Sequence, residues 1–253
     1  MHIPFEPSLF GIHINIHWIL EYVAFFVGFR YYVYLRKNQR DDITSTNRLS
    51  IIIGATLGAF LGSRIVGILE NPIFKLTKEN MMLLLNAKTI MGGLFGGLLG
   101  VEIAKKMIGE KQSSGDLFTL PIIVGIFIGR IGCFLKGTNE FTYGKPTSFF
   151  LGMNLGDGVN RHPLALYELV FLLCLFIFLK RLLKTYTLPN GTIFKLFMLA
   201  YFGFRLCIEF LKPNVFFVAG LSSIQWLCVI CYQYYYKTII KLVTYAGKKI
   251  HVL

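Results

Sequence analysis

Three arginines, Arg64, Arg130 and Arg205, lie in stretches of chain that are otherwise apolar enough to be buried in a lipid bilayer. A guanidinium in a membrane helix costs from about 2.5 to about 10 kcal/mol or more, so its presence calls for a partner. Arginine binds phosphate oxygens in pairs, and a low dielectric strengthens that interaction. The three residues therefore predict a site for an anionic lipid headgroup.

Each of these polar groups also has a structural interpretation. Arg64 could extend to the headgroup layer, and Arg205 could form an i,i+4 ion pair with Glu209 on one helix face. His17, next to Trp18, could be an ordinary interfacial anchor. Arg130 favours binding more strongly, because glycines on both sides of it let a ligand or a backbone approach closely.

The composition is that of a polytopic membrane protein. Of 253 residues, 55% are hydrophobic, 24 are Phe and only 15% are charged, which is far more apolar than a soluble domain. The net charge of +13 is explained by basic cytoplasmic loops rather than by nucleic-acid binding. The five cysteines lie in apolar segments without metal-ligand spacing, and no motif requires a metal or an organic cofactor.

Seven apolar stretches are long enough to cross about 30 Å of hydrocarbon. They predict an all-α fold of seven transmembrane helices in one membrane-embedded domain over 1–253. The third stretch is rich in glycine and is expected to pack closely on its neighbours. The stretches are 16–35, 49–69, 90–108, 117–136, 163–183, 191–211 and 217–236.

Basic residues alternate between the two sides of the predicted bundle. They are dense in the connections 30–48, 105–111 and 180–184 and in the tail 237–249, and sparser on the opposite side, which includes Lys75 and Lys78. The positive-inside rule then places the N-terminus outside and the C-terminus in the cytoplasm. No cleavable signal peptide is predicted, and the basic end after residue 234 is expected to lie against cytoplasmic headgroups.

Residues 137–161 are too polar and glycine-rich to cross a membrane. Their turn signals and short β-prone pieces predict a small external head between spans 4 and 5. The topology places the intramembrane polar groups in the outer half of the bilayer. These groups are the three arginines, His17, Glu21, Glu209, the Arg161–His162 and Tyr167–Glu168 pairs, and Gln225.

Two motifs resemble those of one known family, the prolipoprotein diacylglyceryl transferases. One is Gly129-Arg130-Ile131-Gly132-Cys133-Phe134 followed by Tyr143-Gly144-Lys145-Pro146-Thr147, and the other is Arg161-His162-Pro163 followed by Leu166-Tyr167-Glu168. Further matches run through nearly the whole chain in family order. The resemblance implies a seven-span enzyme of the bacterial inner membrane. Such enzymes move the diacylglyceryl group of phosphatidylglycerol onto the lipobox cysteine of a prolipoprotein, and glycerol phosphate leaves.

The resemblance also implies roles for individual residues. Arg130 and Arg205 would hold the phosphate, with Glu209 orienting Arg205. Arg161, His162 and Glu168 would form the external rim and the start of span 5. The expected catalytic set is Arg130, Arg205, His162, Glu209 and His17, and the expected substrate-binding set is Arg64, Arg130, Gly96, Gly97, Glu140, Arg161, Tyr167, Glu168, Arg205 and Gln225.

Three departures from the family pattern affect the chemistry. Phe95 stands where the family has a histidine before paired glycines, Ile19 replaces a tyrosine and Cys133 replaces an asparagine. The candidates left to activate a thiol are His162, Glu140, Glu209, His17 and Glu21, of which Glu140 aligns only loosely. His17 and Glu21 lie one helical turn apart, which suggests a base with an orienting carboxylate.

Two alternatives follow from the altered polar positions. One is a diverged lipid transferase with another acceptor, and the other is a non-enzymatic membrane protein that binds anionic lipid. Release of glycerol phosphate separates the two enzymes from the lipid-binding protein, and a lipobox peptide as acceptor separates the two enzymes.

Overall fold

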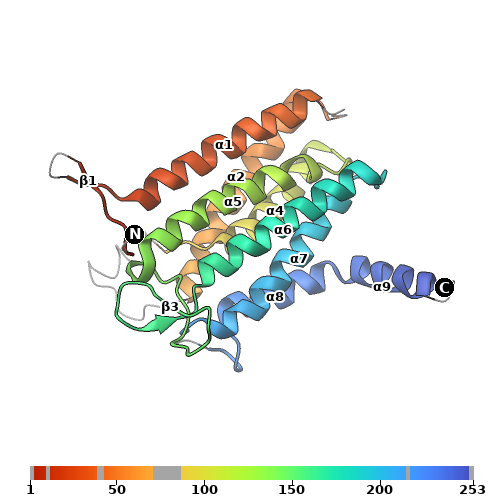
Figure 1. Cartoon of the computed structure of the whole chain (residues 1–253). Coiled ribbons are helices and arrows are strands. Elements are labelled where there is room, and N and C mark those ends of the chain that lie inside the picture. Colours follow the sequence, from red (N-terminus) through yellow and green to blue (C-terminus); the bar gives the residue numbers. More distant parts are fainter. Residues whose placement is uncertain (1–2, 10–11, 39–42, 71–86, 215–216, 251–253) are drawn as a thin grey trace. The chain divides into compact units, whose positions relative to one another are not determined.

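The computed structural model describes residues 3–9, 12–38, 43–70, 87–214 and 217–250, and these are mostly helical (Figure 1). The helices are α1 (Ile16–Asn38), α2 (Ser45–Glu70), α4 (Ile90–Ile108), α5 (Asp116–Lys136), α6 (Leu164–Thr185), α7 (Thr192–Ile208), α8 (Ser223–Tyr234) and α9 (Tyr236–Ile250). The short elements are β1 (Ser8–Leu9), β2 (Ile12–His13), η1 (Gly137–Asn139), β3 (Met153–Asn154), β4 (Asn160–Arg161) and η2 (Glu209–Leu211).

Each of the seven predicted apolar stretches contains a helix, so the predicted helical class is confirmed. Within the described ranges, two segments are long and apolar enough to cross a bilayer, Ser45–Glu70 and Asp116–Asn139. The count of seven spans stays a prediction. So does the orientation, for which Lys75 and Lys78 lie outside the described residues.

The last predicted span, 217–236, starts too early. Val218 and Leu221 instead exchange backbone hydrogen bonds of 2.9 and 3.1 Å in an isolated bridge. Ser222 then caps α8, because its side chain accepts from the backbone N–H of Gln225 while Gln225 Oε1 accepts from the Ser222 N–H. This capping box satisfies two N–H groups that a helix start leaves without partners, and it begins the helix at Ser223.

The described chain forms two compact units. The first unit comprises Met1–Asp42, Ser113–Phe194 and Cys207–Pro213, and the second comprises Ile43–Gln112, Lys195–Leu206 and Asn214–Leu253. The predicted single domain over 1–253 stays a prediction, since each unit is described by itself.

In the first unit, α5 packs against both α1 and α6 (Figure 1). Helices α1 and α5 are in ordinary contact at Gly28 of α1, where an added Cβ would lie 3.4 Å from the carbonyl oxygen of Pro121. Asp116 begins α5 and also accepts the backbone N–H groups of Gly191 and Phe194, at 2.6 and 2.9 Å. Its carboxylate therefore caps the start of α7, where negative charge is favoured.

Residues 137–161 form turns and short strands, as predicted. Strands β3 and β4 pair antiparallel, with Asn154 opposite Asn160. Asn154 Oδ1 accepts the N–H groups of Gly156 and Gly158 in the intervening turn, where both glycines have positive φ. That backbone conformation favours glycine.

An additional hairpin, β1–β2, precedes α1 and was not predicted. The chain before it is held to the end of α5. Phe5 N–H donates to the Leu135 carbonyl at 2.8 Å, and Glu6 Oε1 accepts from Lys136 Nζ at 3.1 Å and from Asn139 Nδ2 at 2.9 Å. These contacts bring the N-terminal segment to the place where the head begins.

In the second unit, α2 and α4 make a seam of facing glycines. A Cβ on Gly96 would collide with the carbonyl oxygen of Gly58 and would lie 2.8 Å from the Cα of Gly62. Only glycine permits backbones this close, and the predicted tight packing of the third apolar stretch is confirmed. The seam joins Gly54, Gly58 and Gly62 of α2 to Gly92, Gly96 and Gly100 of α4.

Candidate active site

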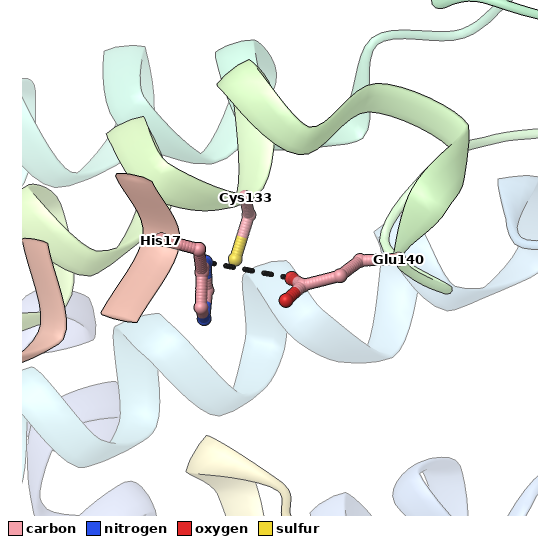
Figure 2. Close-up of side chains that lie close together, drawn as sticks. All are labelled: His17, Cys133 and Glu140. Carbon is pink, nitrogen blue, oxygen red and sulfur yellow. Dashed lines mark ion pairs between the residues drawn. The ribbon is translucent and has the colours of Figure 1, made fainter. Parts of the chain in front are cut away.

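Three side chains from separate parts of the first unit point toward one another: His17, Cys133 and Glu140 (Figure 2). His17 lies in the first turn of α1, Cys133 in the last turn of α5, and Glu140 directly after η1. Gly137 reverses the chain between the last two, with φ of 54°. A Cβ there would collide with the carbonyl oxygen of Leu155, so the turn that delivers Glu140 requires glycine.

The imidazole of His17 lies between two carboxylates. Its Nδ1 is 3.5 Å from Oε2 of Glu140, and its Nε2 is 3.3 Å from Oε1 of Glu21. The ligand atoms of His17, Cys133 and Glu140 all lie within 4.8 Å of one another. The expected contact between His17 and Glu21 is therefore confirmed, while its role in catalysis stays a prediction.

Gly132 sets the approach of α5 to His17. An added Cβ would lie 2.9 Å from Nδ1 and 3.3 Å from Cα of His17. Both distances are tighter than ordinary van der Waals contact, so a larger residue would displace the imidazole. The second glycine of the Gly-Arg-Ile-Gly motif thus has a definite structural purpose.

Arg130 connects this cluster to α6. Its Nε lies 2.8 Å from Oε1 of Glu168, and its Nη1 donates to Sγ of Cys133 at 3.5 Å. Arg130 is 8% exposed and Glu168 2%. Glu168 is thus a buried partner of Arg130 near the start of α6, and its place in the expected site stays a prediction. Pairing with a carboxylate reduces the cost of burying the guanidinium.

The other predicted residues of the first unit lie at the base of the head and the start of α6. Arg161 Nε donates to Oδ2 of Asp157 at 2.7 Å, and its guanidinium lies 5.1 Å from the centroid of the Tyr143 ring. The hydrogen bond from Arg161 lowers the pKa of Asp157. His162 Nδ1 lies 3.2 Å from the hydroxyl of Tyr167.

In the second unit, Arg64 is half-buried on α2, and its Nη1 donates to the Ala87 carbonyl at 3.1 Å. Arg205 is buried on α7. Glu209, of the first unit, begins η2 directly after that helix and is also buried. The i,i+4 pairing of Arg205 with Glu209, and the convergence of the three arginines on one ligand, stay predictions.

Four further positions of the second unit, predicted or notable in the sequence, lie in packed surroundings. Gly96 lies in the glycine seam, and a Cβ on Gly97 would contact Ala55 and Ala59 of α2 at 3.5 Å. Gln225 is 1% exposed, and its Oε1 belongs to the α8 capping box, while Nε2 has no hydrogen-bond partner among the described residues. Phe95 packs on Phe202 and, edge-on, on Tyr234, with centroids 6.5 and 6.2 Å away. An aromatic cluster therefore occupies the place of the family histidine.

The sequence interpretation missed Cys133 as a member of the site. It treated the cysteines as buried thiols without ligand partners, because no other ligand residue stands near Cys133 at a recognised spacing. His17 is 116 positions away, as the numbering shows, and only the packing of α1 on α5 joins them. The sequence signal that could have identified Cys133 is its replacement of an asparagine within a motif that otherwise matches the family.

The first unit therefore presents a helical scaffold with a buried guanidinium beside a thiol, an imidazole and carboxylates. The family model for prolipoprotein diacylglyceryl transferase matches residues 7–240. The chain belongs to this family.

Several bacterial proteins named phosphatidylglycerol–prolipoprotein diacylglyceryl transferase are similar to it. The protein of Nitratidesulfovibrio vulgaris strain DP4 is 32% identical over 202 residues, which cover 74% of this chain and 69% of that protein. The Bordetella bronchiseptica protein is 30% identical, covering 75% and 72%. The Finegoldia magna protein is 28% identical over 88% of each chain.

Proposed function

We propose that this protein transfers the diacylglyceryl group of phosphatidylglycerol to the lipobox cysteine of prolipoproteins. The observation that carries the proposal is the family match over residues 7–240, which contains every residue of the site. In the reaction, the acceptor sulfur attacks the glyceryl carbon that bears the phosphate. The carbon–oxygen bond breaks, a thioether forms, and glycerol phosphate leaves with the bonding electrons.

Binding of the donor is assigned to the arginines. Arg130 is buried and already oriented by Glu168, so a phosphate bound there would meet a guanidinium that needs no further ordering. Arg205, with Glu209 one helical turn further along the chain, is assigned to phosphate binding, and Arg64 to the headgroup region. Arginine guanidinium groups in a medium of low dielectric constant stabilise the charge that develops on the leaving phosphate.

The acceptor end of the reaction is assigned to the cluster around His17. A free thiol is mostly protonated at neutral pH, and the thiolate is the nucleophile. His17 stands between Glu21 and Glu140 next to Cys133, and this arrangement supports thiol activation there. His162 and Tyr167, together with Arg161, are assigned to guiding the peptide past the head.

The membrane arrangement proposed for this chain has seven spans in the bacterial inner membrane. The N-terminus and the head at 137–161 lie outside, and the C-terminus lies in the cytoplasm. The alternation of basic residues supports this orientation. Helices α2 and α5, which are long and apolar enough to cross, support the membrane location.

The test uses the purified protein in detergent with phosphatidylglycerol and a peptide that carries a lipobox cysteine. Glycerol phosphate release and peptide mass are followed together, with Arg130→Ala as the binding-deficient variant. We expect release coupled to a diacylglyceryl mass gain, and loss of both in the variant. Release without a change in peptide mass would favour another acceptor. Absence of release, with lipid still bound, would favour a lipid-binding protein without catalysis.

A further inference from the structure

We propose that His17, Cys133 and Glu140 form a zinc site whose fourth position takes the thiolate of the acceptor cysteine. The identity of the acceptor rests on the proposed transferase function. The metal site itself rests on the geometry of the first unit.

The donor set fits zinc. Zinc accepts thiolate, imidazole and carboxylate ligands, and three protein ligands with one open position are typical of a catalytic zinc. A soft thiolate disfavours magnesium and calcium. In a tetrahedral site with bonds of about 2.0–2.3 Å, neighbouring ligand atoms lie about 3.4–3.6 Å apart. The Nδ1 of His17 and Oε2 of Glu140 are 3.5 Å apart, and all three ligand atoms lie within 4.8 Å.

The ring nitrogen of His17 that faces the cluster is buried, since the residue is only 5% exposed. Nδ1 makes no well-directed hydrogen bond among the described residues, and its contact on that side is the 3.5 Å approach to Oε2 of Glu140. Coordination of a metal would satisfy this weakly partnered buried nitrogen. The nitrogen points toward Cys133 and Glu140 (Figure 2).

The surroundings orient the ligands as in known zinc sites. A metal-bound histidine usually donates its other N–H to a carboxylate, which fixes its tautomer. Glu21 Oε1 lies 3.3 Å from Nε2 of His17 and fits this position. Arg130 Nη1 donates to Sγ of Cys133 at 3.5 Å, which holds the sulfur in place beside His17.

The site also has room for an outside ligand. The side chain of Glu140 is 30% exposed, so one edge of the cluster is accessible. Cys133 also borders a cavity of about 10 Å³, but this cavity is lined by Thr142, Tyr143 and Pro163 and not by His17 or Glu140. Access to the fourth position is therefore from the exposed edge at Glu140, where the incoming thiol would bind.

The chemistry balances without a redox step. Binding of the acceptor thiol to the zinc releases its proton to solvent, because a coordinated thiol is deprotonated. The zinc-held sulfur then forms a bond to the glyceryl carbon while the carbon–oxygen bond breaks and glycerol phosphate leaves. Zinc stays divalent, and the thioether product is exchanged for water. A protein base such as the family histidine, replaced by Phe95, is not needed in this route.

The first experiment measures metal content. Detergent-purified full-length protein is incubated with Zn²⁺, desalted, and analysed by elemental mass spectrometry. We expect about one zinc per chain, given three protein ligands, and little in Cys133→Asn and His17→Asn. Cys133→Asn introduces the asparagine that the family has at this position, and circular dichroism checks that the variant folds. Cys174→Ser, an exposed cysteine of α6, is the matched control and should keep the zinc.

The second experiment replaces zinc with Co²⁺ and adds the lipobox peptide. We expect a sulfur-to-cobalt charge-transfer band that is absent in Cys133→Asn. The band should intensify when the lipobox peptide is added. A peptide in which serine replaces the cysteine should leave it unchanged. Chelator-treated enzyme should lose at least about tenfold in transfer rate and recover it with Zn²⁺ but not Mg²⁺.

The outcomes separate the two proposals. Full transfer by protein that binds no zinc would overturn the metal site and leave the transferase function intact. Zinc retained by folded Cys133→Asn would also overturn the site. A cobalt spectrum unchanged by the peptide would overturn the acceptor role. Bound zinc and a peptide-dependent spectrum with no transfer would instead count against the transferase function alone.

Discussion

Nε of Arg130 lies 2.8 Å from Oε1 of Glu168, and this buried ion pair joins α5 to α6 in the first unit. The same guanidinium donates to Sγ of Cys133. One arginine therefore links the proposed phosphate-binding function to the cluster at which the acceptor is expected. A change at either partner should affect both stability and the position of Cys133.

Glu168→Gln removes the charge of this pair and keeps the shape of the side chain. Breaking a buried ion pair by neutralising one partner costs about 3–5 kcal/mol, so the thermal unfolding midpoint in detergent should fall clearly. Glu102→Gln is the control, since Glu102 is 49% exposed and its pair with Lys105 should contribute at most about 1 kcal/mol. Equal midpoints for the two variants would show that the buried pair does not stabilise the fold.

Gly132→Ala should displace His17, because the new Cβ would lie 2.9 Å from Nδ1. A displacement of about 1 Å at a reacting group can lower the rate about 100-fold. We therefore expect Gly132→Ala to lower the transfer rate. At Gly129 an added Cβ meets no described atom within 4 Å, so Gly129→Ala should leave the unfolding midpoint unchanged or slightly raised. An unchanged transfer rate in Gly132→Ala would contradict the proposed contact with His17.

Gly96→Ala should open the seam between α2 and α4, since its Cβ would collide with the backbone of Gly58. Overpacking of this kind costs about 1–3 kcal/mol. Gly93 is a control one turn away, where a Cβ would lie 3.7 Å from the nearest atoms. Thermal unfolding of the two alanine variants in the same detergent compares them directly. A Gly93→Ala variant as unstable as Gly96→Ala would argue against a specific seam.

Glu21→Ala should lower the transfer rate by about 10–100-fold, the usual effect of removing a carboxylate that orients a functional histidine. Glu21→Gln, which can still accept a hydrogen bond from His17, should lose less. The measurement is peptide mass gain under saturating phosphatidylglycerol. Unchanged turnover in Glu21→Ala would rule out an orienting role for the 3.3 Å contact with His17.

The head should loosen in acid. The hydrogen bond from Arg161 lowers the pKa of Asp157. The ionised carboxylate of Asp157 therefore stabilises the folded head at pH values above the ordinary aspartate pKa. This stabilisation is lost as the pH falls through the lowered pKa. Amide exchange at residues 153–161 should therefore speed up, beyond its intrinsic pH dependence, below the ordinary aspartate range. Asp157→Asn should abolish this extra change. An identical acid response in that variant would assign the effect to another group.

Much of the local structure could be predicted from the sequence. The apolar stretches and the turn residues between them predicted seven segments, each of which contains a helix in the structure. The turn residues of 137–161 predicted the short strands and turns found there. The largest error in a helix start, at α8, follows from a local feature that the apolar pattern does not show, the capping box of Ser222 and Gln225. Family membership was also accessible, because motif residues keep their order along the chain.

The sequence by itself determined the helices, the polar head and the identity of the arginines, since these depend on residue type and on spacing within one segment. Only the tertiary structure decided which groups meet. The contact of His17 with Glu140, the pairing of Arg130 with Glu168 and the glycine seam each join helices far apart in the chain. The physical reason is that such contacts depend on how closely two backbones approach. At Gly132 and Gly96, that approach is possible because a side chain is missing on the face that meets the other helix.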